Sequence, residues 1–435
     1  MDDGMLPCRV QCINCGAAYP PSEIRYTCEC GGLLEVEHDL GKLRSQVSRE
    51  LFDSRNSSFA IRHSQIANCS GVWRYRELVL PVPEESIISR PEGNTALYHN
   101  PHLAQWVGVE EFYLKHEGEN PTGSFKDRGM TVGVTYAKLL GMKAVACAST
   151  GNTSASMAAY AALAGLKAVV FIPEGMIAFG KLAQALAYGA ITLQVKGNFD
   201  TAMALVREAS PALGMYLLNS LNPFRLEGQK TIVFELIHQL GWEPPDWIAL
   251  PAGNLGNTAA FGKALREMKE VGLIEKVPRL LAVQAEGAAP FYRGFVSGFR
   301  KRERVTPNTV ATAIKIGNPV SYERAIRAIR YTDGVVFAVS DQEIMDAKAQ
   351  IDRAGIGCEP ASAASVAGVR KAVREGIIRP GERVVAVLTG HLLKDPGATV
   401  DYHLGRLNGI KPTYANRPVT IEAGLREVER VINSA

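Results

Sequence analysis

The sequence predicts an α/β protein built from two open lobes that each hold a parallel sheet. Short apolar segments recur along the chain, and stretches with helical periodicity separate them. Each apolar segment is continuous rather than alternating, which is typical of parallel strands buried on both faces. Glycine is abundant, at 41 of 435 residues, and several glycines stand where a strand gives way to a helix.

The predicted strands and helices alternate from about Gly93 onward. Strands are expected at 143–148, 167–172, 191–195, 215–220, 246–252, 279–286, 334–340 and 383–389. Helices are expected at 153–164, 181–189, 199–209, 225–240, 257–271, 341–353 and 361–375. Ser340 and Glu343 have the spacing of a capping box. Because eight strands are many for one sheet, the alternation predicts two lobes.

The N-terminal segment is different, because it is rich in cysteine and lacks a long periodic pattern. Cys12 and Cys15 form one tight pair, and Cys28 and Cys30 form another. Four thiolates in two such pairs can bind zinc tetrahedrally, and their clustering in a long chain favours a metal over disulfides. The alternatives are a ribbon with free thiols, or a site in which Cys8 replaces one ligand.

Length and composition are those of a globular protein of roughly two to three domains. The 48 basic and 44 acidic residues leave a net charge of +4, which argues against a nucleic-acid partner. No basic and apolar leader opens the sequence, and no apolar run reaches the roughly 18 residues of a membrane span. We therefore expect a cytoplasmic protein without a membrane partner.

The segment at 120–129, NPTGSFKDRG, is the strongest local signal. Ser124 is expected to cap a helix, which places Lys126 in its first turn. The helix dipole destabilises a positive charge at this position. It therefore favours a lysine that must become neutral or form a Schiff base. From the residues alone, a solvated lysine beside Asp127 and Arg128 is an equal alternative.

Polar residues follow the strand expected at 143–148 and open the next helix. Gly151 allows a close turn and Asn152 offers an amide, and hydroxyl groups surround both: Ser149, Thr150 and Thr153. Such a helix start can bind an anion or a polar ring. From the residues alone, a well-capped helix without a ligand is the favoured alternative.

A third segment, PAGNLGNTAA at 251–260, again closes a strand and opens a helix. Successive backbone amides here can form a nest for a phosphate, and its residues are Gly253, Asn254, Leu255, Gly256 and Asn257. The spacing is neither that of a dinucleotide fingerprint nor that of a P-loop, which disfavours nicotinamide and ATP.

The fourth segment, LTGHLLKDP at 388–396, ends the last strand, where ligands of open α/β sheets bind. Thr389 places a hydroxyl at that edge. His391 is a catalytic candidate, although a lone histidine beside a turn is more often structural. A lysine able to form a Schiff base, a polar loop, a phosphate nest and a hydroxyl are together what pyridoxal phosphate requires.

These four segments, in this order and spacing, resemble the threonine synthase family. That family belongs to the tryptophan-synthase-β group of pyridoxal-phosphate enzymes, fold type II. The resemblance runs from about 93 to 396, some 70% of the chain, and includes the segments at 222–231, 314–319 and 359–365. One departure is Leu392, where the family pattern has glycine after the histidine.

The resemblance implies roles for individual residues. Lys126 is the Schiff-base lysine, Asn152 bonds the 3′-oxygen of the cofactor, and Thr389 faces the pyridine nitrogen. The nest at 253–257 holds the cofactor phosphate. Arg225, together with Ser149, Thr150 and Thr153, suits the phosphate and the carboxylate of the substrate.

The resemblance also implies an activity and a domain plan. The expected reaction, a step of threonine biosynthesis, converts O-phospho-L-homoserine and water to L-threonine and phosphate in a homodimeric enzyme. Residues 1–40 are expected to form a ribbon-like extension, 41–140 with 241–435 a large cofactor-binding domain, and 141–240 a smaller inserted domain.

Two other functions are compatible with the sequence. One is a pyridoxal-phosphate enzyme that performs β-replacement on O-phosphoserine, as a cysteate synthase does. The other is a non-catalytic pyridoxal-phosphate-binding paralogue whose cysteine-rich segment recruits a partner. An intact Lys126 and an intact phosphate nest argue against the non-catalytic protein.

Overall fold

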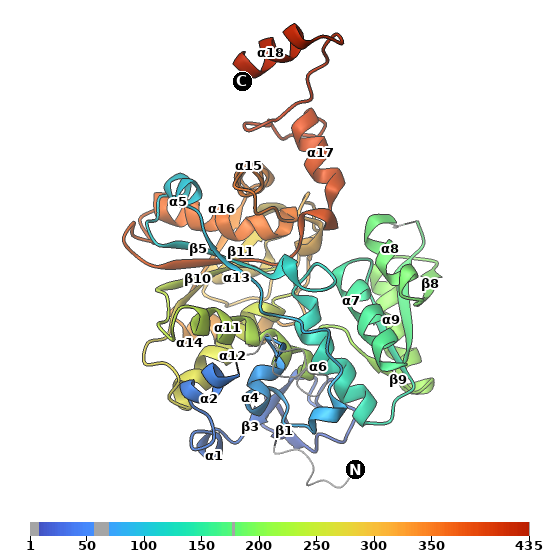
Figure 1. The fold of residues 1–435 in the computed structure, drawn as a ribbon. Helices are drawn as coiled ribbons and strands as arrows, with labels where there is room; N and C mark the ends of the chain where they lie inside the picture. Colours follow the sequence, from blue (N-terminus) through green and yellow to red (C-terminus); the bar gives the residue numbers. More distant parts are fainter. Residues whose placement is uncertain (1–7, 56–68, 176–178, 435) are drawn as a thin grey trace.

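The computed structural model describes residues 8–55, 69–175 and 179–434, and it contains three sheets. A six-stranded sheet and a four-stranded sheet form two lobes that lie side by side (Figure 1), and a small three-stranded sheet lies below them. The predicted α/β class with two parallel-sheet lobes and an N-terminal extension is confirmed.

The larger sheet has the strand order β12-β11-β10-β13-β5-β4, and its pairs are parallel except for the edge pair β4–β5. Its strands are β4 (Leu97–His99), β5 (Phe112–His116), β10 (Trp247–Pro251), β11 (Arg279–Ala285), β12 (Val335–Val339) and β13 (Val384–Leu388). All five residues of β10 are buried, and neighbouring side chains enter different cores: Ile248 the main one, Trp247 a second. Burial on both faces explains the continuous apolar pattern.

Helices cover both faces of this sheet (Figure 1). One face carries α5 (Pro101–Val107), α15 (Asp341–Arg353) and α16 (Pro360–Arg374). The other carries α10 (Pro223–Gln229), α11 (Thr231–Gln239), α12 (Gly256–Glu270) and α14 (Tyr322–Tyr331), with the short α13 (Pro290–Val296) nearby. The capping box predicted at Ser340 and Glu343 is confirmed at the start of α15.

The smaller sheet has the order β8-β7-β6-β9, and its three strand pairs are parallel. Its strands are β6 (Ala144–Ala148), β7 (Lys167–Pro173), β8 (Ile191–Val195) and β9 (Met215–Leu217). The helices of this lobe are α7 (Asn152–Ala164), α8 (Phe179–Ala187) and α9 (Phe199–Ala212), while α6 (Lys126–Leu139) joins the lobes. Every strand here comes from within 144–217; the predicted domain boundaries at 140 and 240 stay a prediction.

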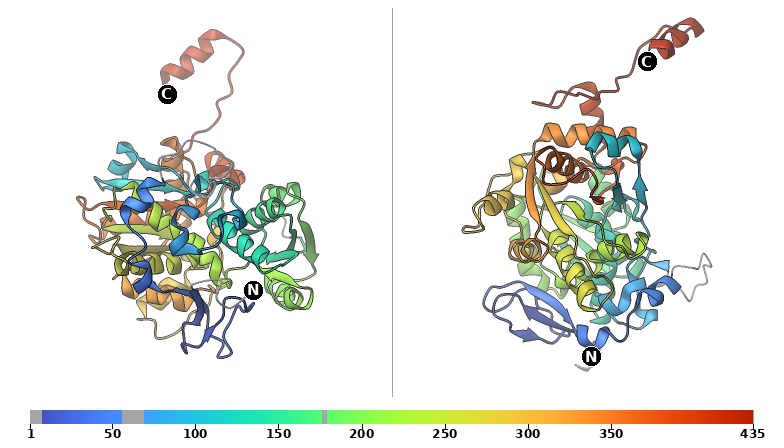
Figure 2. Two further views of the ribbon diagram at one scale, coloured as in Figure 1. Left: turned by 60° about the horizontal axis from the view of Figure 1, so that its bottom comes forward. Right: turned by 90° about the vertical axis from the view of Figure 1, so that its left-hand side faces the viewer.

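The N-terminal extension is a three-stranded antiparallel sheet of order β2-β1-β3. Its strands are β1 (Cys8–Cys12), β2 (Ala18–Tyr19) and β3 (Leu34–His38). It lies at one end of the molecule, opposite the C-terminal arm (Figure 2). The short helices α1 (Leu40–Leu43), α2 (Arg49–Ser54) and α4 (Arg76–Val79) follow it along the chain.

Two predictions are corrected by the structure. The helix expected at 225–240 is two helices, α10 and α11, which meet at Lys230. The strand β5 was not anticipated, although it pairs with β13 inside the larger sheet. Its apolar pattern is interrupted by Lys115, a fully buried cation that pairs with Glu235 at 2.5 Å. Because of this buried charge, the sequence pattern did not identify β5 as a strand inside the sheet.

The chain ends in an arm that leaves the body after α17 (Pro396–Leu404) (Figures 1 and 2). Its terminal helix α18 (Leu425–Ser434) exposes apolar side chains, with Leu425 81% and Ile432 69% exposed. Among the helices of the described residues, none is long and apolar enough to cross a membrane.

A buried ion-pair network joins the end of β5 to α6 and α11. Arg128 contacts Glu117 through two nitrogens, at 2.7 Å each, and Glu235 at 2.8 Å. Glu235 also binds Lys115, and burial is complete for all four side chains. Charges removed from water are tolerated only when each is paired, so the network fixes α6 against β5.

We expect Glu235→Gln to lower the free energy of unfolding by about 3–5 kcal/mol, because it leaves two buried cations without a full countercharge. Urea denaturation monitored by circular dichroism measures this difference. Glu243→Gln is the matched control: Glu243 is 77% exposed and pairs with Arg383 at 3.5 Å, so it should have little effect. Equal effects of the two substitutions would contradict the assignment.

Candidate active site

The carboxyl ends of three neighbouring strands in the larger sheet, β10, β13 and β5, lie at the same edge. His116 at the end of β5 aligns with Leu388 at the end of β13, and β13 runs parallel to β10. The chain therefore brings the loop before Lys126, Thr389 and the segment at 252–257 to the same edge. This is where open α/β sheets bind ligands.

Lys126 begins α6, as the sequence predicted, and hydrogen bonds hold its loop against the end of β13. Phe125 donates its backbone N–H to the carbonyl of Thr389 at 3.0 Å. Ser124 forms a bridge with Gly390. The helix cap is Phe125 rather than the predicted Ser124, whose hydroxyl accepts the Lys126 amide at 3.4 Å. The strand thus fixes the backbone of Lys126.

The amine of Lys126 has no hydrogen bond or ion pair with any of the described residues. Its Nζ lies 3.9 Å from the centre of the Phe125 ring. Desolvation, followed by the positive charge of Arg225, lowers its pKa from 10.5 to about 7, against an opposing effect of Glu359. The structure therefore favours a neutral, nucleophilic lysine over the solvated alternative.

Arg225 is a buried cation on α10, which packs against α6. Its Nη1 donates to the carbonyl of Leu218 at 3.0 Å, while its Nε has no partner within the described ranges. Gly129 of α6 allows this close packing, since a Cβ there would lie 2.9 Å from the Arg225 carbonyl oxygen. Burial lowers its pKa to about 10, so it stays charged near neutral pH. A buried guanidinium with a free donor is suited to an anion.

Asn152 reaches across from the smaller lobe to the larger one. Its side-chain amide donates to Glu359 Oε1 at 3.0 Å, and the Glu359 backbone N–H donates to the carbonyl of Gly390 at 3.0 Å. Glu359 is a buried site residue that sequence reasoning missed. The sequence feature that could have identified it is a carboxylate directly before Pro360, where α16 starts. The Asn152–Glu359 bond joins the carboxyl edges of the two sheets.

The remaining hydroxyl groups line the same region. The Thr389 Oγ lies 3.1 Å from the Ser362 Oγ, a second residue that sequence reasoning missed. Half-buried side chains at the start of α7 are Ser149, Thr150 and Thr153. His391 accepts the Leu393 amide at 3.1 Å and stacks on His116, so the structure gives it a structural role.

One residue of the segment before α12 has the left-handed backbone that the predicted phosphate nest uses. Leu255 adopts φ +64°, in the left-handed region. The side-chain oxygen of Asn254 fixes the segment by accepting a hydrogen bond from the Val320 N–H at 3.1 Å. A Cβ on Gly253 would lie 3.0 Å from the Ile314 Cα, so the backbone is closely packed.

Buried polar atoms without partners in the described structure gather around this nest: Asn257 Oδ1, Thr258 Oγ1 and Gln229 Oε1. A Cβ on Gly256 would lie 3.2 Å from the Gln229 Oε1, which shows that α10 and α12 meet here. Unsatisfied buried groups are rare in proteins and indicate a ligand position. Of the three, only the Thr258 hydroxyl can donate a hydrogen bond to a phosphate, because the other two are amide oxygens that accept. This hydroxyl, the nest and the unpartnered amine of Lys126 fit pyridoxal phosphate.

Comparison with known proteins agrees with this geometry. Residues 88–390 match the family described as pyridoxal-phosphate dependent enzyme. The fold resembles threonine synthase from Escherichia coli, with a TM-score of 0.68 at 20% identity over 98% of this chain and 99% of the other. It also resembles maize serine racemase, with a TM-score of 0.60 at 21% identity over 72% and 93%. The chain is a pyridoxal-phosphate-dependent enzyme.

The relatives found by sequence similarity identify the family more narrowly. Threonine synthase from Methanocaldococcus jannaschii is 47% identical over 97% of this chain and 98% of its own length. Threonine synthase from Methanosarcina acetivorans is 49% identical over 90% and 93%. The chain belongs to the threonine synthase family, a family of lyases, and the resemblance found in the sequence is confirmed.

We expect the rate at which the apoprotein couples to added pyridoxal phosphate to rise with pH and level off above about 7. The reason is that only the neutral amine reacts, and the Lys126 pKa is lowered to about 7. Stopped-flow absorbance across pH 5–9 measures the rate, about two pH units on either side of that pKa. N-acetyl-lysine, whose amine titrates near 10.4, is the control, and a matching profile would show that Lys126 is an ordinary lysine.

Proposed function

We propose that the chain converts O-phospho-L-homoserine and water to L-threonine and inorganic phosphate. The observation that supports this most is the pairing of a lysine amine without a partner, Lys126, with a buried arginine, Arg225, that has no countercharge among the described residues. The Lys126 amine suits proton transfer on an amino acid. The Arg225 guanidinium suits the phosphate group that this substrate carries and releases.

The cofactor would be held by residues of both lobes. We assign Lys126 as its covalent partner, Asn152 and Thr389 as hydrogen-bonding partners of its ring, and the nest at 253–257 as the site for its phosphate. When bound, pyridoxal phosphate stabilises negative charge on the carbons next to the substrate amine. A hydroxyl partner such as Thr389, unlike a carboxylate, would leave the ring nitrogen largely unprotonated.

Lys126 is the proton carrier in this proposal. Its lowered pKa of about 7 leaves much of the amine neutral near physiological pH, as a base requires. The amine takes protons from Cα and Cβ of the substrate and from the water whose oxygen bonds to Cβ. These three protons go to Cγ, to Cα and to the phosphate released from Cγ. The overall reaction consumes one water and releases one phosphate.

Arg225 binds the phosphate group of the substrate, and the hydroxyls at the start of α7 bind its carboxylate: Ser149, Thr150 and Thr153. The helix start also offers free backbone N–H groups to an anion. Because Arg225 extends from α10 while these hydroxyls extend from α7, the substrate would bridge the two lobes.

Turnover of phosphohomoserine tests the proposal directly. We expect stoichiometric L-threonine and phosphate from the holoenzyme, and neither from Lys126→Ala, which should keep its fold but lose the visible absorption of bound cofactor. O-phosphoserine with sulfite is the parallel assay. Turnover of that pair alone would identify a β-replacement enzyme, and no turnover of either would indicate a non-catalytic paralogue.

We expect Arg225→Leu to raise KM for phosphohomoserine at least tenfold with little change in cofactor affinity. A charge-assisted contact to phosphate contributes about 1.5–3 kcal/mol. Initial-rate kinetics measure KM, and absorbance titration measures cofactor binding. Arg207→Leu, an exposed arginine on α9, is the control. Unchanged kinetics would remove Arg225 from the substrate site.

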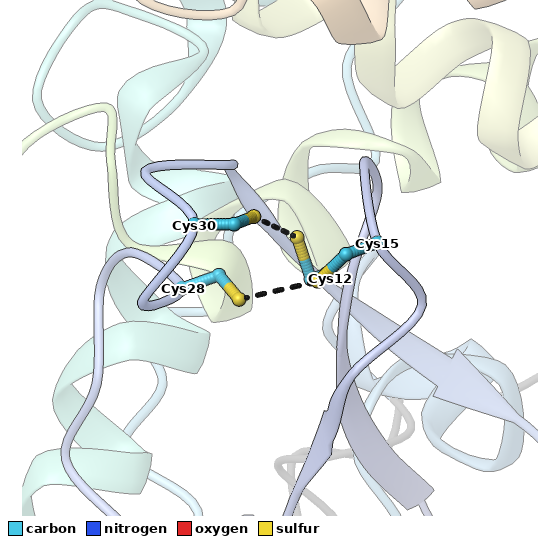
Figure 3. A group of neighbouring side chains, drawn as sticks. All are labelled: Cys12, Cys15, Cys28 and Cys30. Atoms are coloured by element: carbon cyan, nitrogen blue, oxygen red, sulfur yellow. Dashed lines mark hydrogen bonds between the residues drawn. The ribbon is translucent and has the colours of Figure 1, made fainter.

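We also propose that the N-terminal extension binds one zinc ion. The four thiol sulfurs lie within 4.8 Å of one another and point toward a common centre (Figure 3). The Sγ atoms of Cys12 and Cys30 are 3.5 Å apart, as are those of Cys15 and Cys28. Zinc–sulfur bonds of about 2.3 Å in a tetrahedron separate the sulfurs by about 3.8 Å, so the arrangement fits the metal.

Zinc should copurify at about one ion per chain, and Cys28→Ser should lower that content sharply. Cys69→Ser, which lies outside the cluster, is the control and should retain the metal. Elemental analysis of protein prepared without a metal-affinity tag measures both. Chelation should loosen the extension first, because a structural metal stabilises local folding. Metal-free protein with normal stability would leave the extension as a ribbon held by packing.

The homodimer implied by the resemblance and the cytoplasmic location expected from the sequence stay predictions.

A further inference from the structure

Glu359 lies where the two lobes meet, at the start of α16 in the larger lobe. The residue is only 2% exposed, and its backbone N–H donates to the carbonyl of Gly390 at 3.0 Å. A Cβ on Gly390 would lie 2.6 Å from the Glu359 Cδ, so the side chain occupies space that only a glycine leaves open. Because the N-terminus of a helix stabilises negative charge, this position favours an ionised carboxylate.

The carboxylate of Glu359 holds the amide of Asn152 across the junction of the lobes. Its two oxygens accept hydrogen bonds from the Asn152 Nδ2 at 3.0 and 3.3 Å. An ionised carboxylate only accepts hydrogen bonds, so it determines that the nitrogen and not the oxygen of the amide faces it. The amide nitrogen carries two hydrogens, and the second can serve the 3′-oxygen of the cofactor, the partner implied for Asn152.

A second contact holds the helix that carries Asn152. Ser156, one turn after Asn152 on α7, donates to Asp127 at 2.5 Å, and Asp127 directly follows Lys126 on α6. The position of α7 relative to Lys126 is therefore supported without Glu359. A change at Glu359 should alter the orientation of the Asn152 amide rather than the place of the helix.

The charge of Glu359 also acts on Lys126. Burial and then the charge of Arg225 lower the pKa of the Lys126 amine to about 7, and Glu359 opposes both effects. The two charges reach the amine from different elements, Arg225 from α10 and Glu359 from the start of α16. Glu359 is thus the group that favours a positive charge on the Lys126 nitrogen.

The other titratable groups around this junction are Asp127, the thiols of Cys147 and Cys358, and the stacked rings of His116 and His391. Burial raises the pKa of Cys147 to about 12 and that of Cys358 well above its usual value, so both thiols are neutral near pH 7. Burial raises the pKa of Asp127 to about 6, and desolvation lowers the pKa of His116. A titration in the alkaline range therefore leaves the charges of Asp127 and His116 unchanged.

We propose that Glu359 is a positioning residue for the cofactor, which orients the Asn152 amide toward the ring and favours a positive charge on the Lys126 nitrogen that the cofactor engages. A positive charge at that place assists pyridoxal phosphate as an electron sink. This role rests on the cofactor contacts proposed for Lys126 and Asn152, and it does not depend on which phosphorylated amino acid is the substrate.

A pH titration of the visible absorption of the holoenzyme, without substrate, measures the charge on that nitrogen. Glu359→Gln keeps the shape of the side chain and removes its charge, so the midpoint should fall by about one pH unit or more. Glu375→Gln, at the exposed end of the same helix, is the matched control and should leave the midpoint unchanged. An unchanged midpoint in Glu359→Gln would overturn the proposed effect on Lys126.

Glu359→Asp separates charge from packing, because it keeps the carboxylate on a shorter side chain. Its midpoint should lie closer to that of the wild-type protein than the midpoint of Glu359→Gln does. If the midpoints of the two variants were equally low, packing and not charge would explain the shift, and the proposed effect on Lys126 would be wrong.

Cofactor affinity tests the orientation of Asn152 independently of any pH midpoint. Asn152→Ala should weaken the binding of pyridoxal phosphate to the apoprotein about fivefold or more. In the Glu359→Gln background the same substitution should have a much smaller effect, because residues that act together are not additive. Absorbance titration measures all four affinities, and equal effects in the two backgrounds would show that Glu359 does not orient Asn152.

The same spectra distinguish this role from the proposed reaction. A wild-type holoenzyme without a visible absorption band would contradict the assignment of Lys126 and, with it, the role of Glu359. A normal band without turnover of phosphohomoserine would contradict only the proposed reaction.

Discussion

The buried guanidinium of Arg128 is the constraint on which the arrangement of the active site depends. It binds Glu117, directly after β5, and Glu235 on α11, and it lies two residues after Lys126. Each charge in this buried cluster needs its partner, since an unpaired buried ion is strongly destabilising. The first turn of α6 therefore has one position relative to β5, and the reactive lysine inherits that position.

From this anchor, the site is assembled where the carboxyl edges of two parallel sheets meet. The Asn152–Glu359 bond spans the lobes at the edge, and Ser156 on α7 donates to Asp127 on α6 at 2.5 Å behind it. Neither lobe holds a complete set of groups, because the lysine and the nest belong to one and the polar helix start to the other. A change in lobe spacing would therefore alter substrate contacts before it altered the covalent chemistry.

The N-terminal extension is connected to the same machinery through α10. His38 at the end of β3 lies 2.6 Å from the carboxylate of Glu227, two residues after Arg225, and Lys263 on α12 binds that carboxylate too. The start of α12 belongs to the proposed phosphate nest. Docking of the extension thus stabilises both helices to which phosphate-directed groups are assigned.

The sequence by itself determined the alternation of strands and helices, the place of Lys126 at a helix start and the clustering of the cysteines, because these depend on local spacing along the chain. Helix starts, tight turns and apolar runs are encoded by neighbouring residues. Only the tertiary structure revealed β5 and the contacts of Glu359 and Ser362. In each case a polar or charged residue is buried against a partner distant in sequence, and no local pattern states which distant residue will compensate it.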